Sequence, residues 1–270
     1  MPTGVSQAKK KNGSIYYRSG ITYRGRHISL GSFSTEDAAA AAYLDASKLI
    51  TDTAVTLVNF STEHFTLSFE KIIILLNFRD NGIYFKTPIY LRKGYFSYFL
   101  TPHMELKFDI DDLFYYSGRK IQKRQGHLFV SDYGMQYSIS ARYGIKPYAV
   151  FGRDYEFANG DPLDYRYSNI IIHNHYHGVT RLEKNGFCRY RAVIHINGNH
   201  TIGIYASEEE AAIAYNKAAA LAKAAGICKS FPENYLECLS GKEYTEIYSK
   251  LMISERYLSY LASLDSLRQR

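Results

Sequence analysis

Two segments of the chain, residues 4–50 and 178–222, show the same alternation of hydrophobic and polar positions. In each segment, short alternating stretches are separated by a Lys-Asn-Gly turn and then by a second turn with Gly. Alternation with a period of two is typical of half-buried strands, and Asn-Gly is a common hairpin turn. Each segment therefore predicts three antiparallel strands of a small sheet.

A helix is expected after the strands of each segment. Ser34-Thr35-Glu36-Asp37 and Ser207-Glu208-Glu209-Glu210 both combine an N-cap residue with an acidic first turn. The runs that follow are rich in Ala, a strong helix former whose small side chain lets a helix lie close to a sheet. Each segment then consists of a three-stranded sheet with a helix on one face and an open second face.

The two segments are copies of one repeat. Both begin Gly-Val-Ser/Thr, continue through Tyr-Arg-x-x-Ile and Gly-x-Phe/Tyr, and end in an Ala-rich stretch that contains Ala-Tyr. The alignment needs one extra residue before the Lys-Asn-Gly turn of the first copy and one deletion after Gly198 in the second. So ordered a match indicates an internal duplication.

Strand alternation assigns side chains to the two faces of each sheet. In the first copy, Tyr17 and Ile21 are expected to face the helix, and Tyr190 and Ile194 take these positions in the second copy. The opposite, outward positions are Ser6, Ala8, Arg18, Gly20, Thr22, His27, Ser29, Thr180, Leu182, Arg191, Val193 and His195.

Together, Gly-Val-Ser, Tyr-Arg-x-x-Ile, Gly-Arg-His-Ile-x-Leu-Gly-x-Phe and Ala-Ala-x-Ala-Tyr resemble the APETALA2/ethylene-response DNA-binding domain in its bacterial and phage integrase-like form. The resemblance covers the repeat twice, about a third of the chain. It implies that the helix-free face of each sheet lies in the major groove of DNA. The family usually places several Arg and Trp there, whereas this chain keeps one Arg per copy among small and polar residues. We therefore expect limited sequence preference.

The charge of the chain agrees with a DNA partner. It has 33 Lys and Arg against 26 Asp and Glu, a formal net charge of +7, and residues 1–33 contain no acid. Taken alone, Lys9–Lys11 is typical of a solvated loop, but beside this sheet an unopposed basic patch suits phosphate contacts. The residues expected to bind duplex DNA are Lys9, Lys10, Lys11, Arg18, Thr22, Arg24, Arg26, His27, Thr180, Arg189, Arg191 and His195.

The middle of the chain contains a second motif. The run Asn159-Gly160-Asp161-Pro162-Leu163-Asp164-x-Arg166-x-Ser168-Asn169 resembles that of HNH homing endonucleases, which are often fused to this DNA-binding module. The resemblance implies a ββα-type domain over residues 107–177. It also implies that two histidines and an asparagine of the nuclease site are replaced by Ala141, Phe157 and Tyr165. Phe157 cannot take a proton, and all three positions have lost the residue that the family's chemistry needs, so the prediction is a scaffold without nuclease chemistry.

Three alternating histidines leave a metal site open. On a strand, His173, His175 and His177 would project from one face, and imidazoles gathered on one face can bind a divalent ion. Against this, no acidic residue stands between Asp164 and Glu183. We expect no cofactor, with Mg²⁺ required only if the chain is a working nuclease.

The remaining segments are assigned by composition and periodicity. Residues 56–106 are expected to be an aromatic, β-rich connector. Residues 229–270 have apolar residues at spacings of three and four, which indicates amphipathic helices that either cap the last domain or bind a partner. The predicted fold is therefore α+β, with small modules at 1–55 and 178–228 flanking a central ββα-type HNH-like domain at 107–177, and a helical C-terminal tail.

Composition also bears on location. Three cysteines without a C-x-x-C pair exclude a disulfide scaffold and a four-cysteine zinc module. The first residues have no apolar core typical of a secretory signal, and the longest aliphatic run, residues 72–76, is too short to span a bilayer. We expect a soluble protein of the bacterial cytoplasm, nucleoid-associated when bound to DNA, with no membrane partner.

Three functions fit these observations. The first is a non-catalytic DNA-binding protein derived from an HNH homing endonuclease of a phage or mobile element, with a regulatory or counter-defence role. The second is an active metal-dependent nicking endonuclease. The third is an inhibitor or adaptor that uses the same scaffold to bind a host protein. The sequence does not indicate the oligomeric state.

Overall fold

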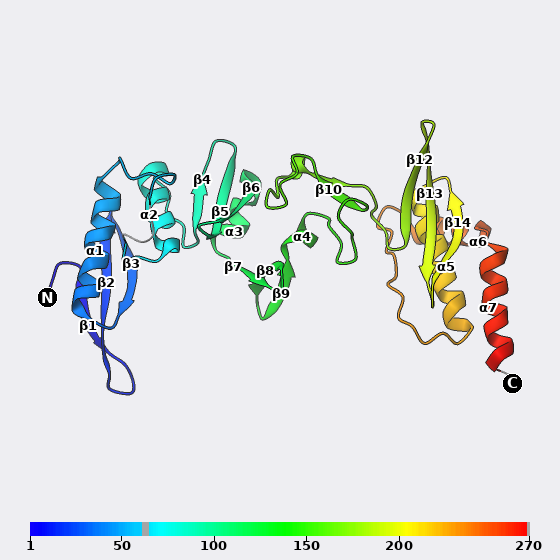
Figure 1. Ribbon diagram of the computed structural model, residues 1–270, viewed down its shortest axis with the longest axis horizontal. Coiled ribbons are helices and arrows are strands. Elements are labelled where there is room, and N and C mark those ends of the chain that lie inside the picture. Colours follow the sequence, from blue (N-terminus) through cyan, green and yellow to red (C-terminus); the bar gives the residue numbers. More distant parts are fainter. Residues whose placement is uncertain (61–64, 269–270) are drawn as a thin grey trace. The chain divides into compact units, whose positions relative to one another are not determined.

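The computed structural model describes residues 1–60 and 65–268 (Figure 1). The chain divides into two compact units. The first unit contains residues 1–139 and 161–169, and the second contains residues 140–160 and 170–270. Helices and several small three-stranded antiparallel sheets occur in the described part of the chain, which confirms the α+β class. An HNH-like domain flanked by two modules stays a prediction.

The first repeat forms the sheet and helix expected of it. Its elements are β1 (Val5–Lys9), β2 (Ile15–Tyr23), β3 (Arg26–Phe33) and α1 (Glu36–Thr51), and we call residues 1–51 the first module. The strands are antiparallel in the order β1-β2-β3. Thr35 caps α1 by accepting a hydrogen bond at 3.2 Å from the Ala38 N–H. Buried Ile21 packs on the helix face, as predicted, and Ile28 of β3 packs beside it.

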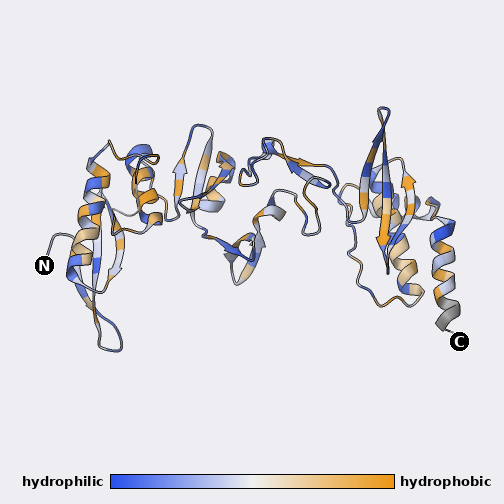
Figure 2. Ribbon diagram, viewed as in Figure 1, coloured by the Kyte–Doolittle hydropathy of each residue, from blue (hydrophilic) through white to orange (hydrophobic). Residues whose placement is uncertain are grey.

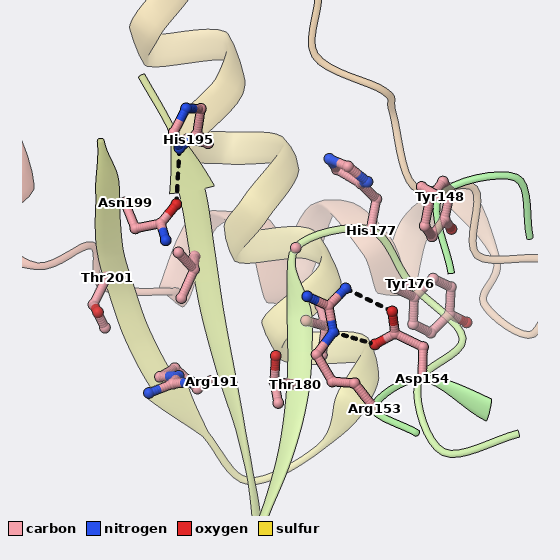
Figure 3. A pocket seen from close by; sticks show the side chains of 13 residues that line it. Tyr148, Arg153, Asp154, Tyr176, His177, Thr180, Arg191, His195, Asn199 and Thr201 are labelled. Carbon is pink, nitrogen blue, oxygen red and sulfur yellow. Dashed lines mark hydrogen bonds and ion pairs between the residues drawn. The ribbon is translucent and has the colours of Figure 1, made fainter. Parts of the chain in front are cut away.

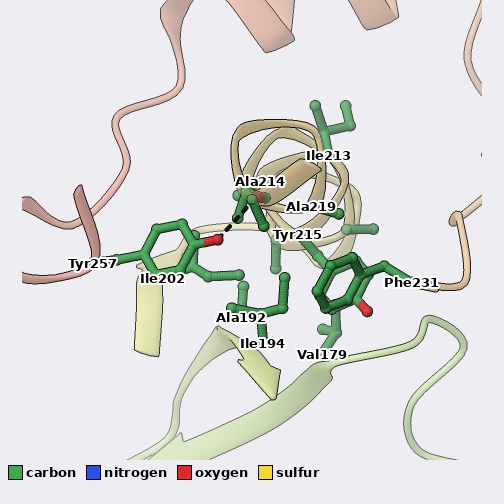
Figure 4. Packing of buried hydrophobic residues seen from close by; sticks show 14 of the residues in the cluster. Val179, Ala192, Ile194, Ile202, Ile213, Ala214, Tyr215, Ala219, Phe231 and Tyr257 are labelled. Atoms are coloured by element: carbon green, nitrogen blue, oxygen red, sulfur yellow. Dashed lines mark hydrogen bonds between the residues drawn. The ribbon is translucent and has the colours of Figure 1, made fainter. Parts of the chain in front are cut away.

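The second repeat, residues 178–224, forms the second module in the second unit. Its elements are β12 (Val179–Lys184), β13 (Phe187–His195), β14 (Asn199–Tyr205) and α5 (Glu208–Ala224). Ser207 and Glu210 form a reciprocal capping box at the start of α5. Ala192 and Ile194 of β13 are fully buried under α5 (Figure 4). The inward positions predicted from alternation are therefore confirmed in this module too.

A glycine and a tyrosine shared by the repeats hold each sheet against its helix. A Cβ atom built on Gly4 would lie 2.2 Å from the Tyr43 ring, and one built on Gly178 would lie 2.4 Å from the Tyr215 ring. Both glycines have a φ of +73°. The Gly-Val-Ser/Thr and Ala-Tyr motifs are thus two sides of one close contact.

The stretch from residue 69 to residue 81 corrects the expectation of a β-rich connector over residues 56–106. It forms helix α2 (Phe69–Asn81), which follows Ser68 and ends at Gly82 in the left-handed conformation. Its aliphatic residues are buried on every side of the helix, so the sequence lacks the polar positions at helical spacing that would have predicted a helix. Ile72, Leu75, Leu76 and Phe78 join the core of the first module.

Arg79 fixes α2 to the first module. Its side chain is 7% exposed and ion-pairs with Asp80 at 2.6 Å. Its Nη1 donates to the carbonyl oxygens of Leu49 at 2.8 Å and Asp52 at 2.9 Å, at the end of α1. A charged side chain thereby satisfies carbonyl groups that a helix end leaves without partners.

The rest of the first unit consists of two small sheets and short helices. Phe96, Phe108 and Tyr116 form its aromatic core, with the rings of Phe108 and Tyr116 stacked at 4.2 Å between centroids. The elements are β4 (Ile89–Leu91), β5 (Tyr95–Thr101), β6 (Met104–Asp109), η2 (Ile110–Asp112), α3 (Leu113–Ser117), β7 (Ile121–Arg124), β8 (His127–Asp132), β9 (Met135–Ser138) and η3 (Tyr167–Asn169).

Residues 161–169 return to the first unit and pair with β6. The Lys107 N–H donates to the Leu163 carbonyl at 3.0 Å, and the Tyr165 N–H donates to the Lys107 carbonyl at 2.8 Å. Lys107 Nζ also ion-pairs with Asp161 at 2.9 Å. The chain thus passes through the second unit at residues 140–160 before it completes the first.

The C-terminal helices pack on the second module, which supports their role as a cap. The elements of the second unit outside that module are α4 (Ile139–Arg142), which begins at the last residue of the first unit, β10 (Tyr155–Phe157), β11 (Ile170–Ile172), α6 (Gly241–Lys250) and α7 (Glu255–Arg268). Tyr257 of α7 is buried, and its hydroxyl donates to the Ala218 carbonyl at 2.9 Å. Hydrophobic and hydrophilic residues are interspersed along α7 (Figure 2).

Candidate nucleic-acid interface

Each module has an outer face, which is the face of its sheet opposite the helix. Strand register places on the first outer face Ser6, Ala8, Tyr16, Arg18, Gly20, Thr22, His27, Ser29 and Ser32. It places on the second outer face Thr180, Leu182, Arg189, Arg191, Val193, His195, Asn199, Thr201 and Ile204. Neither set contains an acidic residue.

Arg18 is the central cation of the first outer face. It lies between Ser6 and Ser32 on the neighbouring strands. Its Nε and Nη2 donate to the Tyr16 hydroxyl at 3.1 and 2.6 Å, and its guanidinium carbon lies 5.3 Å from the Tyr16 ring centroid. Lys10 Nζ lies 6.0 Å from the same ring. Tyr16 therefore orients an exposed positive charge through a hydrogen bond and a cation–π contact.

The other end of the first outer face is formed by Thr22 and His27, which lie opposite each other on β2 and β3. Both side chains are exposed. The His27 ring lies over Gly20, where a Cβ atom would approach it to 2.7 Å. Gly20 thus makes room for an imidazole that can donate or accept hydrogen bonds.

Arg24 and Arg26 are directed away from Arg18, although the sequence groups them with it. Arg24 Nη2 donates to the Arg79 carbonyl of α2 at 3.3 Å. The Arg26 guanidinium carbon lies 4.2 Å from the Tyr84 ring centroid. Both remain exposed at the β2–β3 turn, so they add positive charge beside the outer face rather than on it. Lys9, Lys10 and Lys11 are exposed at the other end of the sheet.

On the second outer face, Arg191 lies between Thr180 of β12 and Ile204 of β14. Arg189 lies opposite Leu182, and both arginines are exposed. His195 Nδ1 lies 2.8 Å from the Asn199 Oδ1 (Figure 3). All four residues predicted for DNA binding in this module, Thr180, Arg189, Arg191 and His195, therefore share one face.

A hollow of about 390 Å³ lies on the second outer face (Figure 3). One side is formed by β12–β14 and the other by Tyr148, Arg153, Asp154 and residues 176–178. Its polar side chains are Tyr148, Arg153, Asp154, Tyr176, His177, Thr180, Arg191, His195, Asn199 and Thr201. Two guanidinium groups and several neutral donors therefore surround a space with a single carboxylate.

That carboxylate, Asp154, joins the loop to the sheet. It is 5% exposed and accepts hydrogen bonds from Arg153 and from the Val150 N–H at 2.8 Å. Asn174 Nδ2 donates to Asp154 at 3.0 Å, while Asn174 Oδ1 accepts from the Arg181 N–H of β12 at 2.7 Å. These contacts hold Arg153 over the outer face, with its side chain 56% exposed.

The protonation states in the hollow follow from the same contacts. Burial tends to raise the pKa of Asp154, but hydrogen bonds from Arg153, Val150 and Asn174 and the Arg153 charge lower it overall. The hydrogen bond to Asp154 raises the pKa of Arg153. Burial and the Arg153 charge lower the pKa of His177, so its neutral form is favoured. Arg153 and Arg191 thus bring positive charge to the hollow, and His177 brings a neutral imidazole.

The positions that the HNH resemblance implies for catalysis carry structural side chains. Phe157 is buried in β10 and packs against Phe151 and Tyr155, with ring centroids 6.2 and 5.9 Å away. Tyr165 belongs to the first unit, where its buried ring stacks on Phe108 at 5.8 Å. Ala141 is exposed in α4.

The three histidines 173, 175 and 177 do not form a row on a strand, because β11 ends at Ile172. His173 Nε2 lies 3.3 Å from Glu156, and His175 Nδ1 lies 2.9 Å from Glu208. The His177 ring lies edge-on to the rings of Tyr148 and Tyr215. In the part of the chain that the structure describes, no three His, Cys, Asp or Glu side chains are grouped so that they could hold a metal ion.

Sequence reasoning missed Tyr16 and Ser32 on the first outer face, Asn199, Thr201 and Ile204 on the second, and Arg153 beside the second. Tyr16 occupies an outward position by the same alternation that identified Arg18, so its place could have been found from the sequence. Arg153 reaches the second outer face through Asp154 and Asn174, a contact between segments distant in sequence that periodicity does not report.

Comparison of the chain with protein-family models, with curated proteins and with solved structures finds no match. Among the described residues, no helix has the length and apolar character needed to cross a membrane.

Proposed function

We propose that this protein binds duplex DNA through the outer faces of its two modules and does not cleave it. The observation that carries the proposal is that both outer faces expose arginine, Arg18 on the first and Arg189 and Arg191 on the second, without an acidic residue. DNA presents a regular array of phosphates, and arginine is suited to bind phosphate and guanine.

The hollow on the second outer face supports the same proposal. Arg153 and Arg191 provide charged donors, and Thr180, Thr201 and Asn199 provide neutral side chains that can hydrogen-bond a sugar–phosphate backbone. Their arrangement suits a phosphate contact at the edge of the sheet while the strands face the base edges.

Buried Phe157 and Tyr165 support the non-catalytic part of the proposal. A general base must reach a water molecule and take its proton, which the ring of Phe157 cannot do. Tyr165 stands where the family has its asparagine, and its ring is buried against Phe108. Both instead fill aromatic cores. The proposed role is therefore that of a binding scaffold related to HNH homing endonucleases, with regulation or counter-defence as its expected context.

The test is duplex binding as a function of salt. Each neutralised phosphate contributes about −0.9 to the log–log salt slope, so four to six contacts imply a slope of roughly −4 to −5. The double variant Arg18→Ala, Arg191→Ala should weaken binding to many sequences alike and flatten the slope. Fluorescence anisotropy at several salt concentrations measures both effects.

Lys120→Ala is the matched control, because Lys120 lies in the first unit away from its outer face and pairs with Glu70 at 2.6 Å. It removes a positive charge without removing a proposed contact. A flat salt response, or a Lys120→Ala effect at least half as large as that of the double variant, would contradict duplex binding by these faces. Metal-dependent nicking of a plasmid by the wild-type protein would contradict the non-catalytic assignment.

A further inference from the structure

The second outer face carries exposed apolar side chains that the proposed phosphate contacts do not use. Phe187 of β13 is 76% exposed and Ile204 of β14 is 59% exposed, and Leu182 of β12 is half-buried. Together with Arg189 they line an open hollow of about 700 Å³ at the β12–β13 end of the face. We call Leu182, Phe187 and Ile204 the apolar row.

The first module lacks this row at the equivalent positions. Ile204 lies opposite Arg191, and the residue opposite Arg18 in the same register is Ser32. Leu182 corresponds to Ala8 of β1. Because the two modules share one fold, the sheet does not require large apolar side chains here. The row therefore points to a ligand that the second module contacts differently.

Charge around the row identifies what kind of ligand that is. The same hollow is bordered by Arg181, Lys184 and Arg189, and its one acid, Glu183, lies 3.2 Å from Arg181 in an ion pair. A border with a net positive charge favours a polyanionic ligand over a protein surface that has no acidic patch. The major groove of DNA offers phosphates at its edges and, at thymine, an apolar 5-methyl group in its floor.

We propose that the second module reads thymine 5-methyl groups in the major groove through Leu182 and Ile204, beside Arg189 and Arg191. The inference rests on the proposed function and adds to it a base preference that belongs to one module. Phe187, at the tip of the β12–β13 hairpin, covers the outer side of the contact and excludes water from it.

The experiment compares two duplexes of identical sequence, one with thymidine and one with deoxyuridine at every thymidine position. The duplexes have the same phosphates and hydrogen-bonding edges and differ only in the 5-methyl groups. Burial of one methyl-sized group corresponds to about a fourfold change in affinity. The full-length protein should bind the thymidine duplex about fourfold more tightly for each methyl group contacted.

Variants locate the effect. Ile204→Ser gives the second module the residue of the first and should reduce the thymidine-to-deoxyuridine affinity ratio toward one, and Leu182→Ala should reduce it in part. Leu44→Ser, at a 66% exposed apolar residue of α1, is the control and should keep the wild-type ratio. Thermal unfolding of each variant checks that the fold is retained.

The outcomes separate this inference from the function on which it rests. Equal affinity of the wild-type protein for the two duplexes, with salt-dependent binding retained, would overturn methyl reading alone. A ratio that Ile204→Ser leaves unchanged, or that Leu44→Ser lowers equally, would overturn the assignment to the apolar row. Absence of binding to either duplex would overturn the proposed function and the inference together.

Discussion

A single missing side chain sets the distance between sheet and helix in each module. Gly178 brings its backbone against the ring of Tyr215, which is 1% exposed, and Gly4 does the same with Tyr43. The two requirements at Gly178, a left-handed backbone and the absence of a Cβ atom, are physically separate. The contribution of each to the free energy of unfolding can therefore be measured by substitution.

We expect Gly178→Ala to destabilise the protein by about 3 kcal/mol, of which roughly 1 kcal/mol is backbone strain and the rest is overpacking. The new Cβ would lie 2.4 Å from the Tyr215 ring and 2.6 Å from the Val193 carbonyl oxygen. The control is Gly186→Ala in the β12–β13 turn, where φ is +78° and nothing lies within 4 Å of an added Cβ. Urea unfolding measures both; equal losses would show that the ring contact contributes nothing.

At the scale of elements, α2 shows how a helix outside the repeat becomes part of the first module. Its aliphatic face completes the core under α1, and Arg79 carries its charge to the end of α1. An arginine that is 7% exposed has lost most of its hydration, so its hydrogen bonds must replace water. Arg79 thus adds a polar link between α1 and α2 to their shared apolar core.

Replacing that side chain tests the junction. Arg79→Met keeps most of the apolar stem but removes the bonds to the Leu49 and Asp52 carbonyl groups, and we expect a loss of about 2–3 kcal/mol in the free energy of unfolding. Lys120→Met is the control, because Lys120 is 62% exposed in its pair with Glu70 and such pairs contribute about 0–1 kcal/mol. Calorimetry or urea unfolding measures both losses of stability. If Arg79→Met and Lys120→Met destabilise the protein equally, Arg79 does not cap α1.

The elements also show what the sequence could predict. Alternation and Asn-Gly turns predicted β12 and β13 because one sheet face is buried and the other is not. The same signal is absent from α2, whose residues are buried all round, although Ser68 and Gly82 mark its two ends. The position of Arg153 depends on Asp154 and Asn174, which meet only after the chain has folded.

At the scale of the whole molecule, one chain carries two outer faces that differ in chemistry. The first presents Arg18 with small and polar neighbours, and the second adds the apolar row and the hollow around Arg153. When two binding modules share a chain, binding of the first raises the effective concentration of the second to about the millimolar range. Two weak modules can then give tight binding together.

The bivalent arrangement predicts a dependence on duplex length. The full chain should bind a duplex of roughly 40 bp far more tightly than one of roughly 10 bp, a single helical turn that has room for one module. Arg189→Ala with Arg191→Ala should remove most of this difference, because the second module then no longer adds to the first. Competition titrations measure the difference in affinity between the two duplexes. If the affinity of the wild-type protein, corrected for the number of sites, does not depend on duplex length, bivalent binding is excluded.

The interleaving of the two units has a consequence for synthesis on the ribosome. Residues 161–169, which pair with β6, are made only after residues 140–160 of the second unit. At about 5–20 residues per second, the free edge of β6 is made a few seconds before the segment that bonds to Lys107. Asp154 likewise waits for Asn174 before its loop is fixed. Neither unit can therefore be finished before the other has begun, and the nascent chain must hold two incomplete folds at once.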